Sequence, residues 1–410
     1  MASSINASTS GAGGVITTAD NSGVLNLQSG GVTQATVSST GLSLPTNGTI
    51  NTANTFGFKN RLINGAMVIA QRSTSNTTAT GYQTVDRWSF NATQSNKLTW
   101  NQNYASVTPA TGFTNYLGMQ TGGSAYSVVS TDYFVFQQVI EGSNCSDFAW
   151  GTANAKTVTL SFWVYSSLTG TFGGVLQNSG ASQNYPFSYT ISSANTWEQK
   201  SITITGPTSG TWITNTGAGI YVCFSVGAGS TYTTTGGAWT STVSFQATGS
   251  TSVVGTANAT WFMTGAQLEI GSQATSFDFR SIGTELALCQ RYTYVVGNTG
   301  EIIPFNGVAR GLSTWFVTIN TPVAMRSTPS LSITGGGTIR ATYNGTEVNS
   351  SANSSTIGGA ALEINFATSW ANSNQILLDY YSISGATPAA GSAALALTFN
   401  YGSFIFSSEL

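Results

Sequence analysis

Charged side chains are scarce in this sequence, and that scarcity limits what it can fold into. Lys, Arg, Asp and Glu together fill 6% of the 410 positions, and histidine is absent. Ordinary soluble domains carry about 25% charged residues. The chain is nevertheless 40% hydrophobic and 11% aromatic, which is ample material for a core and excludes disorder. Its Thr, Val, Tyr, Phe and Trp favour strands, and its Gly, Asn and Ser favour turns, so we predict an all-β protein.

The shortage of charge also bears on assembly. Charged side chains, Lys above all, protect the open edges of sheets from pairing with other chains. A chain with many strands and few such residues needs closed sheets, or edges buried against other copies of itself. We therefore expect a homo-oligomer and predict a homotrimer.

Composition argues against several functions. Without histidine there is no His base, nucleophile or metal ligand. A net charge of −2 and a pI of about 5.1 argue against nucleic acid as a partner. No apolar stretch is long enough to span a membrane, so we expect no membrane insertion. The N-terminus has neither the basic nor the apolar region of a secretory signal, which predicts synthesis in a cytoplasm.

Cys145, Cys223 and Cys289 lie far apart and are odd in number. Their spacing fits neither a disulfide framework nor a zinc site, so we interpret them as buried, inert thiols. We expect no metal and no cofactor.

The chain divides into four parts by composition and periodicity. Residues 1–55 are rich in Gly, Ser and Thr and too poor in apolar residues for a core, which suggests an arm that attaches to another protein. Residues 56–280 carry strand signals about every 10–20 residues, typical of a β-sandwich such as a jelly roll. Residues 281–296 predict a helical joint that begins near Thr284 and stops at Gly297. Residues 297–410 predict a second β-sandwich module.

Strands in the second part alternate between an aliphatic and an aromatic or polar face. In 158–165, Trp163 and Tyr165 lie on the face opposite the aliphatic one. In 220–226, Tyr221 likewise lies opposite the aliphatic face. Trp239 lies in a Gly-rich loop. Flat aromatic faces stack on sugar rings, so we nominate these four as a glycan-binding platform. The alternative for each is that a loop, another module or a neighbouring subunit covers it.

Other aromatic and acidic residues are assigned to structure. We expect Trp88, Trp197 and Trp261 to pack in the body. A glycosidase needs two carboxylates about 5–9.5 Å apart. The acidic residues of the body form no such pair in sequence, so we predict no catalytic residue: Glu141, Asp147, Glu198, Glu269 and Asp278.

Several short strings, in order along the chain, resemble tail-fibre proteins of marine and cyanobacterial phages. They are FKNRLING (58–65), QR (71–72), VDRW (85–88), QVIEG (138–142), AKTVTLSFWV (155–164), TWE (196–198), TGAQLEIG (264–271), GTELALCQRY (283–292), PVAMRSTP (322–329) and SEL (408–410). Ala66 and Ala70 stand where members of that family often carry acidic residues. The arm at 1–55 is similar to fibre attachment segments only in composition.

The resemblance implies a jelly roll like carbohydrate-binding modules within a trimeric virion fibre that binds host surface polysaccharide, with residues 1–55 docked on a tail or head protein. It implies no catalytic residue. Two alternatives stay open: a head or collar fibre or tail adaptor that binds no ligand, and a depolymerase that cleaves glycans.

Overall fold

The structure is a computed structural model. It describes residues 3–7, 15–18, 22–39, 41–43, 58–297, 305–309, 314–334, 337–343, 346–352, 356–357, 360–364, 375–381, 395–399 and 403–410. Within these ranges the one α-helix is α1 (Ile282–Gln290), and strands make up the rest of the regular structure apart from short 3-10 turns. The prediction of an all-β protein is confirmed.

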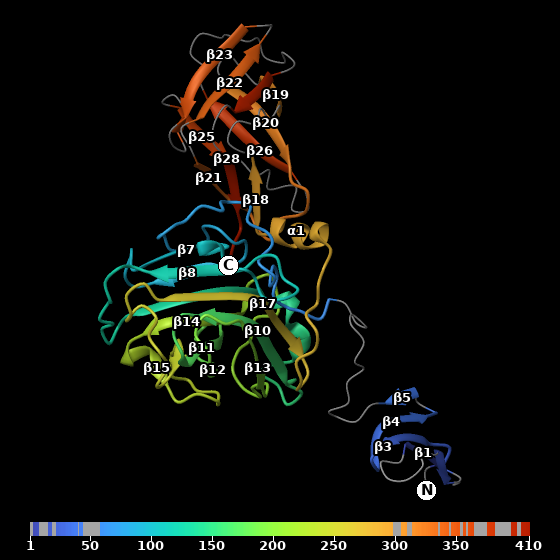
Figure 1. Ribbon diagram of the computed structural model, residues 1–410. Coiled ribbons are helices and arrows are strands. Elements are labelled where there is room, and N and C mark those ends of the chain that lie inside the picture. Colours follow the sequence, from blue (N-terminus) through green and yellow to red (C-terminus); the bar gives the residue numbers. More distant parts are fainter. Residues whose placement is uncertain are drawn as a thin grey trace.

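The body is a sandwich of two five-stranded antiparallel sheets (Figure 1). We call them the β10 sheet and the β14 sheet. In spatial order the β10 sheet contains β13 (Glu198–Ile204), β10 (Val158–Ser166), β17 (Thr260–Ile270), β8 (Leu117–Thr121) and β7 (Leu98–Gln102). The β14 sheet contains β12 (Asn184–Ile191), β11 (Gly170–Asn178), β14 (Ala218–Ala228), β9 (Tyr133–Glu141) and β6 (Ser89–Ala92). The loops carry η1 (Tyr104–Ser106), η2 (Gly142–Asn144), η3 (Ser146–Phe148), η4 (Ser230–Tyr232), β15 (Thr233–Thr234) and β16 (Gln246–Ala247).

The core lies between the two sheets, where the aliphatic faces of β10 and β14 meet. Phe162 of β10 and Phe224 of β14 touch edge to face, with ring centroids 4.9 Å apart. Trp261 is fully buried, stacks on Phe136 at 5.7 Å and donates its indole N–H to the Tyr189 hydroxyl at 3.1 Å. Burying each large apolar side chain contributes about 1.5–3 kcal/mol, so this layer stabilises the body.

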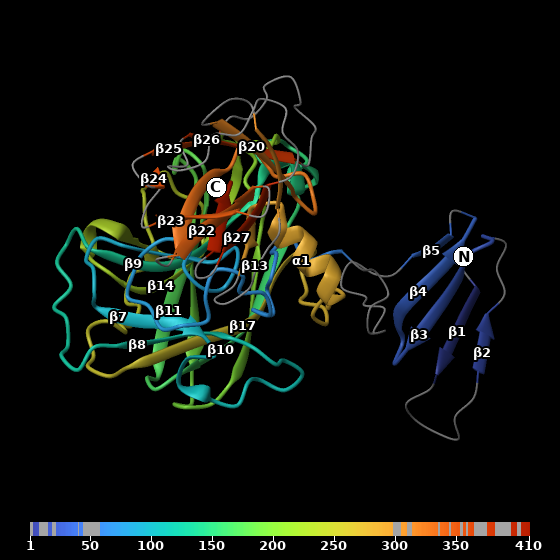
Figure 2. The ribbon, with the colours of Figure 1, turned by 90° about the horizontal axis from the view of Figure 1, so that it is seen from above.

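The arm forms a separate five-stranded sheet, and Figure 2 shows its strands side by side. Its order is β2 (Val15–Thr18), β1 (Ser3–Ala7), β3 (Leu25–Ser29), β4 (Val32–Ser38) and β5 (Gly41–Ser43). Gly30 and Gly31 both have positive φ, the geometry of a two-residue hairpin turn between β3 and β4.

The helical joint is shorter than predicted. The helix ends at Gln290, and Thr293–Val296 forms strand β18 instead, because these β-branched and aromatic residues pair with β28. Ser281, not Thr284, occupies the N-cap position. The helix does dock as expected: Leu286 and Cys289 pack in one cluster with Ile63 and Ile69.

The C-terminal part contains a small sheet and a barrel. The small sheet is β18 (Thr293–Val296), β28 (Ser403–Ser407) and β21 (Ser330–Thr334). The barrel order is β19 (Phe305–Ala309), β20 (Thr314–Asn320), β26 (Gln375–Tyr381), β25 (Ala360–Ile364), β24 (Thr356–Ile357), β23 (Thr346–Ala352), β22 (Gly337–Tyr343) and β27 (Leu395–Phe399).

The barrel strands close on themselves, whereas the sequence predicted a second β-sandwich module here. Closure removes free sheet edges, which a charge-poor chain protects badly.

Among the described residues, no helix combines the length and hydropathy needed to cross a membrane.

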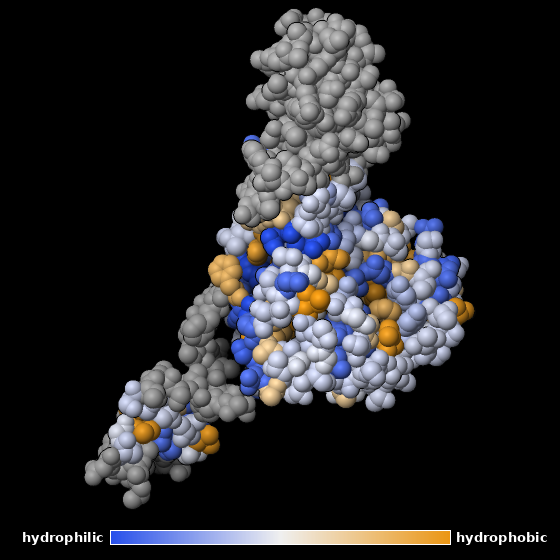
Figure 3. Space-filling model, turned by 180° about the vertical axis from the view of Figure 1, so that it is seen from behind, coloured by the Kyte–Doolittle hydropathy of each residue, from blue (hydrophilic) through white to orange (hydrophobic). Residues whose placement is uncertain are grey.

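The surface of the body matches the composition. In Figure 3 most of the described surface is pale, the colour of intermediate hydropathy, and strongly hydrophilic or hydrophobic residues gather in small patches. Uncharged polar residues therefore cover the sandwich.

The close approach of residues 61–65 to β17 generates a prediction about two glycines. The backbone of Gly65 accepts a bond from the Ala266 N–H at 3.0 Å, and a Cβ on Gly65 would overlap the Ala266 carbonyl oxygen. We expect Gly65→Ala to lower the free energy of unfolding by about 2 kcal/mol or more.

Gly283, exposed in α1 with open space around it, is the matched control. There Ala should raise stability by about 0.5–1 kcal/mol, measured by urea unfolding. Equal effects of the two substitutions would contradict the packing described.

Candidate functional site

The four aromatic residues predicted as one platform do not lie together. Trp163 and Tyr165 lie on the outer face of the β10 sheet, Tyr221 lies on the outer face of the β14 sheet, and Trp239 lies in a loop. All four are half-buried. Because the two sheets turn their outer faces in opposite directions, the four residues form three separate groups.

A loop covers the first group. Tyr165 stacks on Phe262 at 5.1 Å and contacts Trp197, whose indole N–H donates to the Thr108 carbonyl at 2.9 Å. Phe113, from the same loop as Thr108, flanks Gly265 together with Trp163. The loop over residues 103–116 therefore occupies much of this face, as the structural alternative supposed.

Trp239 belongs to a cluster at the edge of the sandwich. Its ring meets Trp150 and Trp212 edge to face, with centroids 5.3 and 5.6 Å away. Its indole N–H donates to the Thr205 carbonyl at 2.7 Å. These contacts fix the loop to the body. Trp88 and Trp261, predicted to be structural, are fully buried.

Tyr221 lies half-buried on the outer face of the β14 sheet. Across the strands it is paired with Gln177 of β11 and Val139 of β9, and Gln177 is in turn paired with Asn184 of β12. Two residues before Val139 in β9, Gln137 is paired with Ser89 of β6. We call Ser89, Gln137, Gln177 and Tyr221 the Tyr221 face.

Gln177 carries an unmet hydrogen-bonding group on this face. Its side chain is 8% exposed, and its amide oxygen has no hydrogen-bond partner within the described part of the chain. Leaving a buried acceptor unpaired costs about 1–3 kcal/mol. The oxygen is closed to solvent, so it accepts a bond from a ligand hydroxyl only after the side chain turns outward. Gln177 was not among the predicted site residues, although its alternation with Leu176, which faces the core, places it on the outward face.

The rest of the same sheet is covered by residues 230–250. Tyr133 packs against Phe245 at 4.5 Å, and the Ser225 hydroxyl donates to the Gln246 side chain at 2.8 Å. This segment limits the Tyr221 face at one end.

The three cysteines are free and buried, as predicted. Burial raises the pKa of Cys145 to about 12 and that of Cys223 and Cys289 well above the ordinary value. All three thiols stay protonated near neutral pH, which makes them poor nucleophiles.

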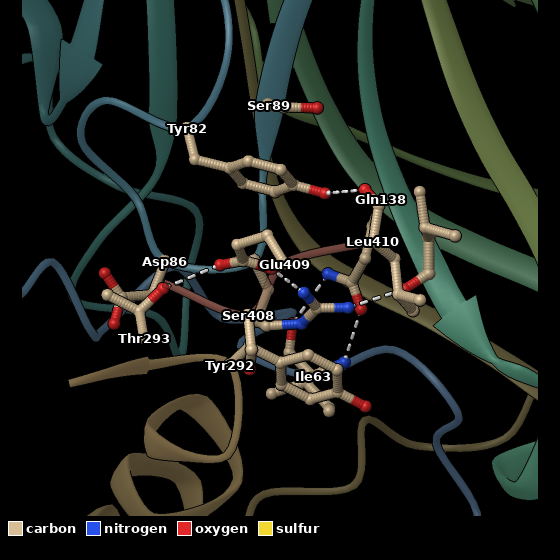
Figure 4. Close-up of polar contacts among 12 residues, drawn as sticks. Ile63, Tyr82, Asp86, Ser89, Gln138, Tyr292, Thr293, Ser408, Glu409 and Leu410 are labelled. Carbon is tan, nitrogen blue, oxygen red and sulfur yellow. Dashed lines mark hydrogen bonds and ion pairs between the residues drawn. The ribbon is translucent and has the colours of Figure 1, made fainter. Parts of the chain in front are cut away.

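Many of the scarce charges meet at one place, where residues 58–88, α1 and the last residues of the chain come together. We call it the junction (Figure 4). Glu409 forms a close ion pair with Arg87 and accepts a bond from the Thr293 hydroxyl at 2.9 Å. The side chains of Glu409 and Arg87 are 6% and 1% exposed. The Arg87 guanidinium also lies 3.5 Å from the centre of the Tyr292 ring.

A second ion pair of the junction joins β9 to the residue after α1. Glu141 accepts bonds from Arg291 Nη2 at 2.7 Å and Nε at 2.9 Å, and from the Tyr292 hydroxyl at 2.6 Å. Burial opposes ionisation of Glu141, but the hydrogen bonds from Arg291 and Tyr292 hold its pKa below the ordinary value.

Amide side chains complete the junction. Gln138 exchanges two 2.7 Å bonds with the backbone of Ile63, and Asn64 bonds the backbone of Ile69 and Asp86. Several of the strings that carried the family resemblance thus meet here, although they are dispersed in sequence: 58–65, 85–88, 138–142, 283–292 and 408–410. Glu269 and Asp278 are likewise hydrogen-bonded within the structure. In the described part of the chain, no group of three or more Cys, Asp or Glu side chains could hold a metal ion.

Comparisons with known proteins give structural similarities only. No family model and no curated protein sequence matches the chain. Tailspike protein 4 of bacteriophage CBA120, in its enzymatically active domain, is similar with a TM-score of 0.29 and 10% identity, over 52% of this chain and 21% of that chain.

Carbohydrate-binding modules are also similar. The module TmCBM61, solved with β-1,4-galactotriose, gives a TM-score of 0.27 and 11% identity over 52% of this chain and 98% of its own. The family 11 module from Clostridium thermocellum gives 0.25 and 12% over 50% and 99%. With TM-scores this low, the similarities assign no function to the chain.

The Glu141 pair generates a prediction about pH. We expect Glu141→Gln to lower the free energy of unfolding at pH 7 by about 1.5–3 kcal/mol, because it removes the charged acceptor of the hydrogen bonds from Arg291 and Tyr292. A carboxylate with a lowered pKa stabilises the fold above its unfolded pKa, near 4.5, and loses that effect as the pH falls. The difference between wild type and variant, measured by urea unfolding, should therefore shrink below pH 4.5.

The control is Asp147→Asn, at an ion pair with Arg61 in which the Asp147 side chain is 46% exposed. That change should cost less than about 1 kcal/mol. A Glu141→Gln effect that stays constant from pH 7 to pH 3 would contradict the electrostatic explanation.

Proposed function

We propose that this protein binds glycans through the Tyr221 face. The observation that carries the proposal is the buried, unpartnered amide oxygen of Gln177 directly beside the half-buried ring of Tyr221. A sugar unit offers both an apolar ring face and hydroxyl donors, and so complements this pair.

The chemistry of the face supports the proposal. Stacking a sugar ring on an aromatic side chain contributes about 0.5–1.5 kcal/mol beyond its area burial. Gln137, also half-buried, adds a second amide on the neighbouring strand. Neutral amides and a phenol suit uncharged hydroxyl groups, and each hydrogen bond adds about 0.5–1.5 kcal/mol.

The test is affinity electrophoresis of the full chain through gels that contain bacterial capsular polysaccharide, lipopolysaccharide O-chains or plant β-glucans. We expect retardation in at least one gel. Tyr221→Ala and Gln177→Ala should each weaken binding about tenfold, the equivalent of about 1.4 kcal/mol.

Trp163→Ala is the matched control, because Trp163 is equally a half-buried aromatic residue on a strand but lies on the opposite sheet. It should leave binding unchanged if the protein stays folded by circular dichroism. Loss of binding with Trp163→Ala and not with Tyr221→Ala would move the site to the β10 sheet. No retardation in any gel would overturn the proposal.

We further propose that the chain is a homotrimeric virion fibre, made in the host cytoplasm, whose arm docks on a tail or head protein. The arm supports this proposal. Leu27, Val32 and Val37 are 38%, 62% and 40% exposed, and no second layer covers this sheet within the described residues. A single sheet needs a packed layer for stability, which another copy or a virion protein would supply.

Sedimentation equilibrium tests the assembly, with a trimer expected at micromolar concentration. A monomer there would refute the trimer. Deletion of residues 1–55 should abolish incorporation into particles; particles that still carry the shortened chain would refute the arm as anchor.

We propose binding without cleavage. Incubation with the retarding polysaccharide should release no reducing sugar, and release would favour the depolymerase alternative.

A further inference from the structure

A pocket opens at the junction, apart from the residues of the Tyr221 face. Its volume is about 370 Å³, within the range of roughly 300–1,000 Å³ that small-molecule sites occupy. It lies between residues 72–83 and strands β21 and β28. Its lining includes one guanidinium, one phenol ring, one amide, hydroxyl groups and one aliphatic side chain, from Arg72, Tyr82, Gln83, Ser332, Ile405 and Ser407.

The Arg72 charge in the wall is only partly met. Both terminal nitrogens of Arg72 lie 3.5 Å from one oxygen of Glu409, and the nearer hydroxyl, that of Ser407, is at 3.1 Å. Close ionic hydrogen bonds are about 2.7–2.9 Å long. Arg87 forms the close pair with the other Glu409 oxygen. An anionic group in the pocket would therefore find guanidinium donors that Glu409 leaves weakly engaged.

Burial supports this view of Arg72. Its side chain is 7% exposed, and desolvation lowers its pKa even though Asp86 nearby acts in the opposite direction. A carboxylate within hydrogen-bonding distance would stabilise the charged form of this desolvated guanidinium.

The remaining walls fit a sugar rather than a bare anion. The Tyr82 ring centre lies 5.5 Å from the Arg72 guanidinium carbon, and Ile405 adds an aliphatic surface. Gln83 donates its amide N–H to the Thr80 carbonyl at 2.7 Å, which orients the side chain. Ser332 and Ser407 offer hydroxyls. A pyranose that bears a carboxylate combines one anionic group, one apolar face and several hydroxyls.

We propose that the junction pocket binds a carboxylate-bearing sugar residue, with Arg72 on the carboxylate and Tyr82 against the ring. The pocket is lined by residues outside the Tyr221 face, although the Tyr82 phenol lies close to Ser89 and Tyr221. The proposal does not require that a glycan bind at the Tyr221 face.

The test is an NMR titration of the full chain with methyl glucuronide, methyl glucoside and acetate as separate probes. We expect saturable shifts of the Arg72 guanidinium and Gln83 amide signals with methyl glucuronide. Methyl glucoside lacks the carboxylate, so it should bind about tenfold or more weakly than methyl glucuronide, since a hydrogen bond to a charged group contributes about 1.5–3 kcal/mol. Acetate should bind less tightly than the glucuronide. Equal binding of glucuronide and glucoside, acetate as tight as glucuronide, or no shift with any probe would each overturn the proposal.

Variants locate the site. Arg72→Gln should abolish the preference for the glucuronide, and Gln83→Ala, which leaves the ion pairs of Glu409 in place, should weaken both sugars. Arg61→Gln, at an exposed ion pair, is the control and should bind like wild type. Gln177→Ala should also leave this titration unchanged, so failure here and failure at the Tyr221 face are distinguishable. Wild-type glucuronide binding by both Arg72→Gln and Gln83→Ala would refute the pocket.

Discussion

The structure depends on a small set of buried charges that join distant parts of a nearly uncharged chain. Glu409 pairs with Arg87 beside the end of the sequence, and Glu141 pairs with Arg291 just after α1. Removing one partner of a buried pair is costly because the other charge stays desolvated. The pairs therefore specify one arrangement of residues 58–88, α1 and the final strand. A sandwich covered by Ser, Thr and Asn has few other polar contacts of comparable strength to fix that arrangement.

Sheet edges receive a different treatment in each part of the chain. Eight of the C-terminal strands close into a barrel, which leaves no free edge among those eight, and β18, β28 and β21 form a small open sheet. The arm keeps an open sheet with exposed Leu27, Val32 and Val37. The scarcity of charge predicts either closed sheets or edges shielded by other copies. The barrel is a closed sheet of this kind. The exposed apolar side chains of the arm's open sheet support the proposed docking at residues 1–55.

The two proposed sugar sites differ in the chemistry that they offer. The Tyr221 face has a phenol and neutral amides on a regular sheet, and so suits uncharged hydroxyls along a chain. The junction pocket offers a guanidinium with a loosely engaged carboxylate partner, and so suits a single acidic unit. Both lie on rigid elements, because the strands of the β14 sheet position Gln177 and Tyr221, and the buried ion pairs position Arg72. Rigid placement lowers the entropy that a ligand must overcome on binding.

The sequence by itself determined the strand content, the division of each body strand into two faces and the burial of the three cysteines, because these follow from local alternation and composition. It did not determine which faces share a side. Trp163 and Tyr221 both alternate with aliphatic residues, yet β10 and β14 belong to different sheets, so the predicted platform separated. Nor could it pair the charges: Glu141 and Arg291 are 150 positions apart, and Arg87 and Glu409 are 322 apart. Such contacts depend on strand order and register across the whole fold, which local periodicity does not encode.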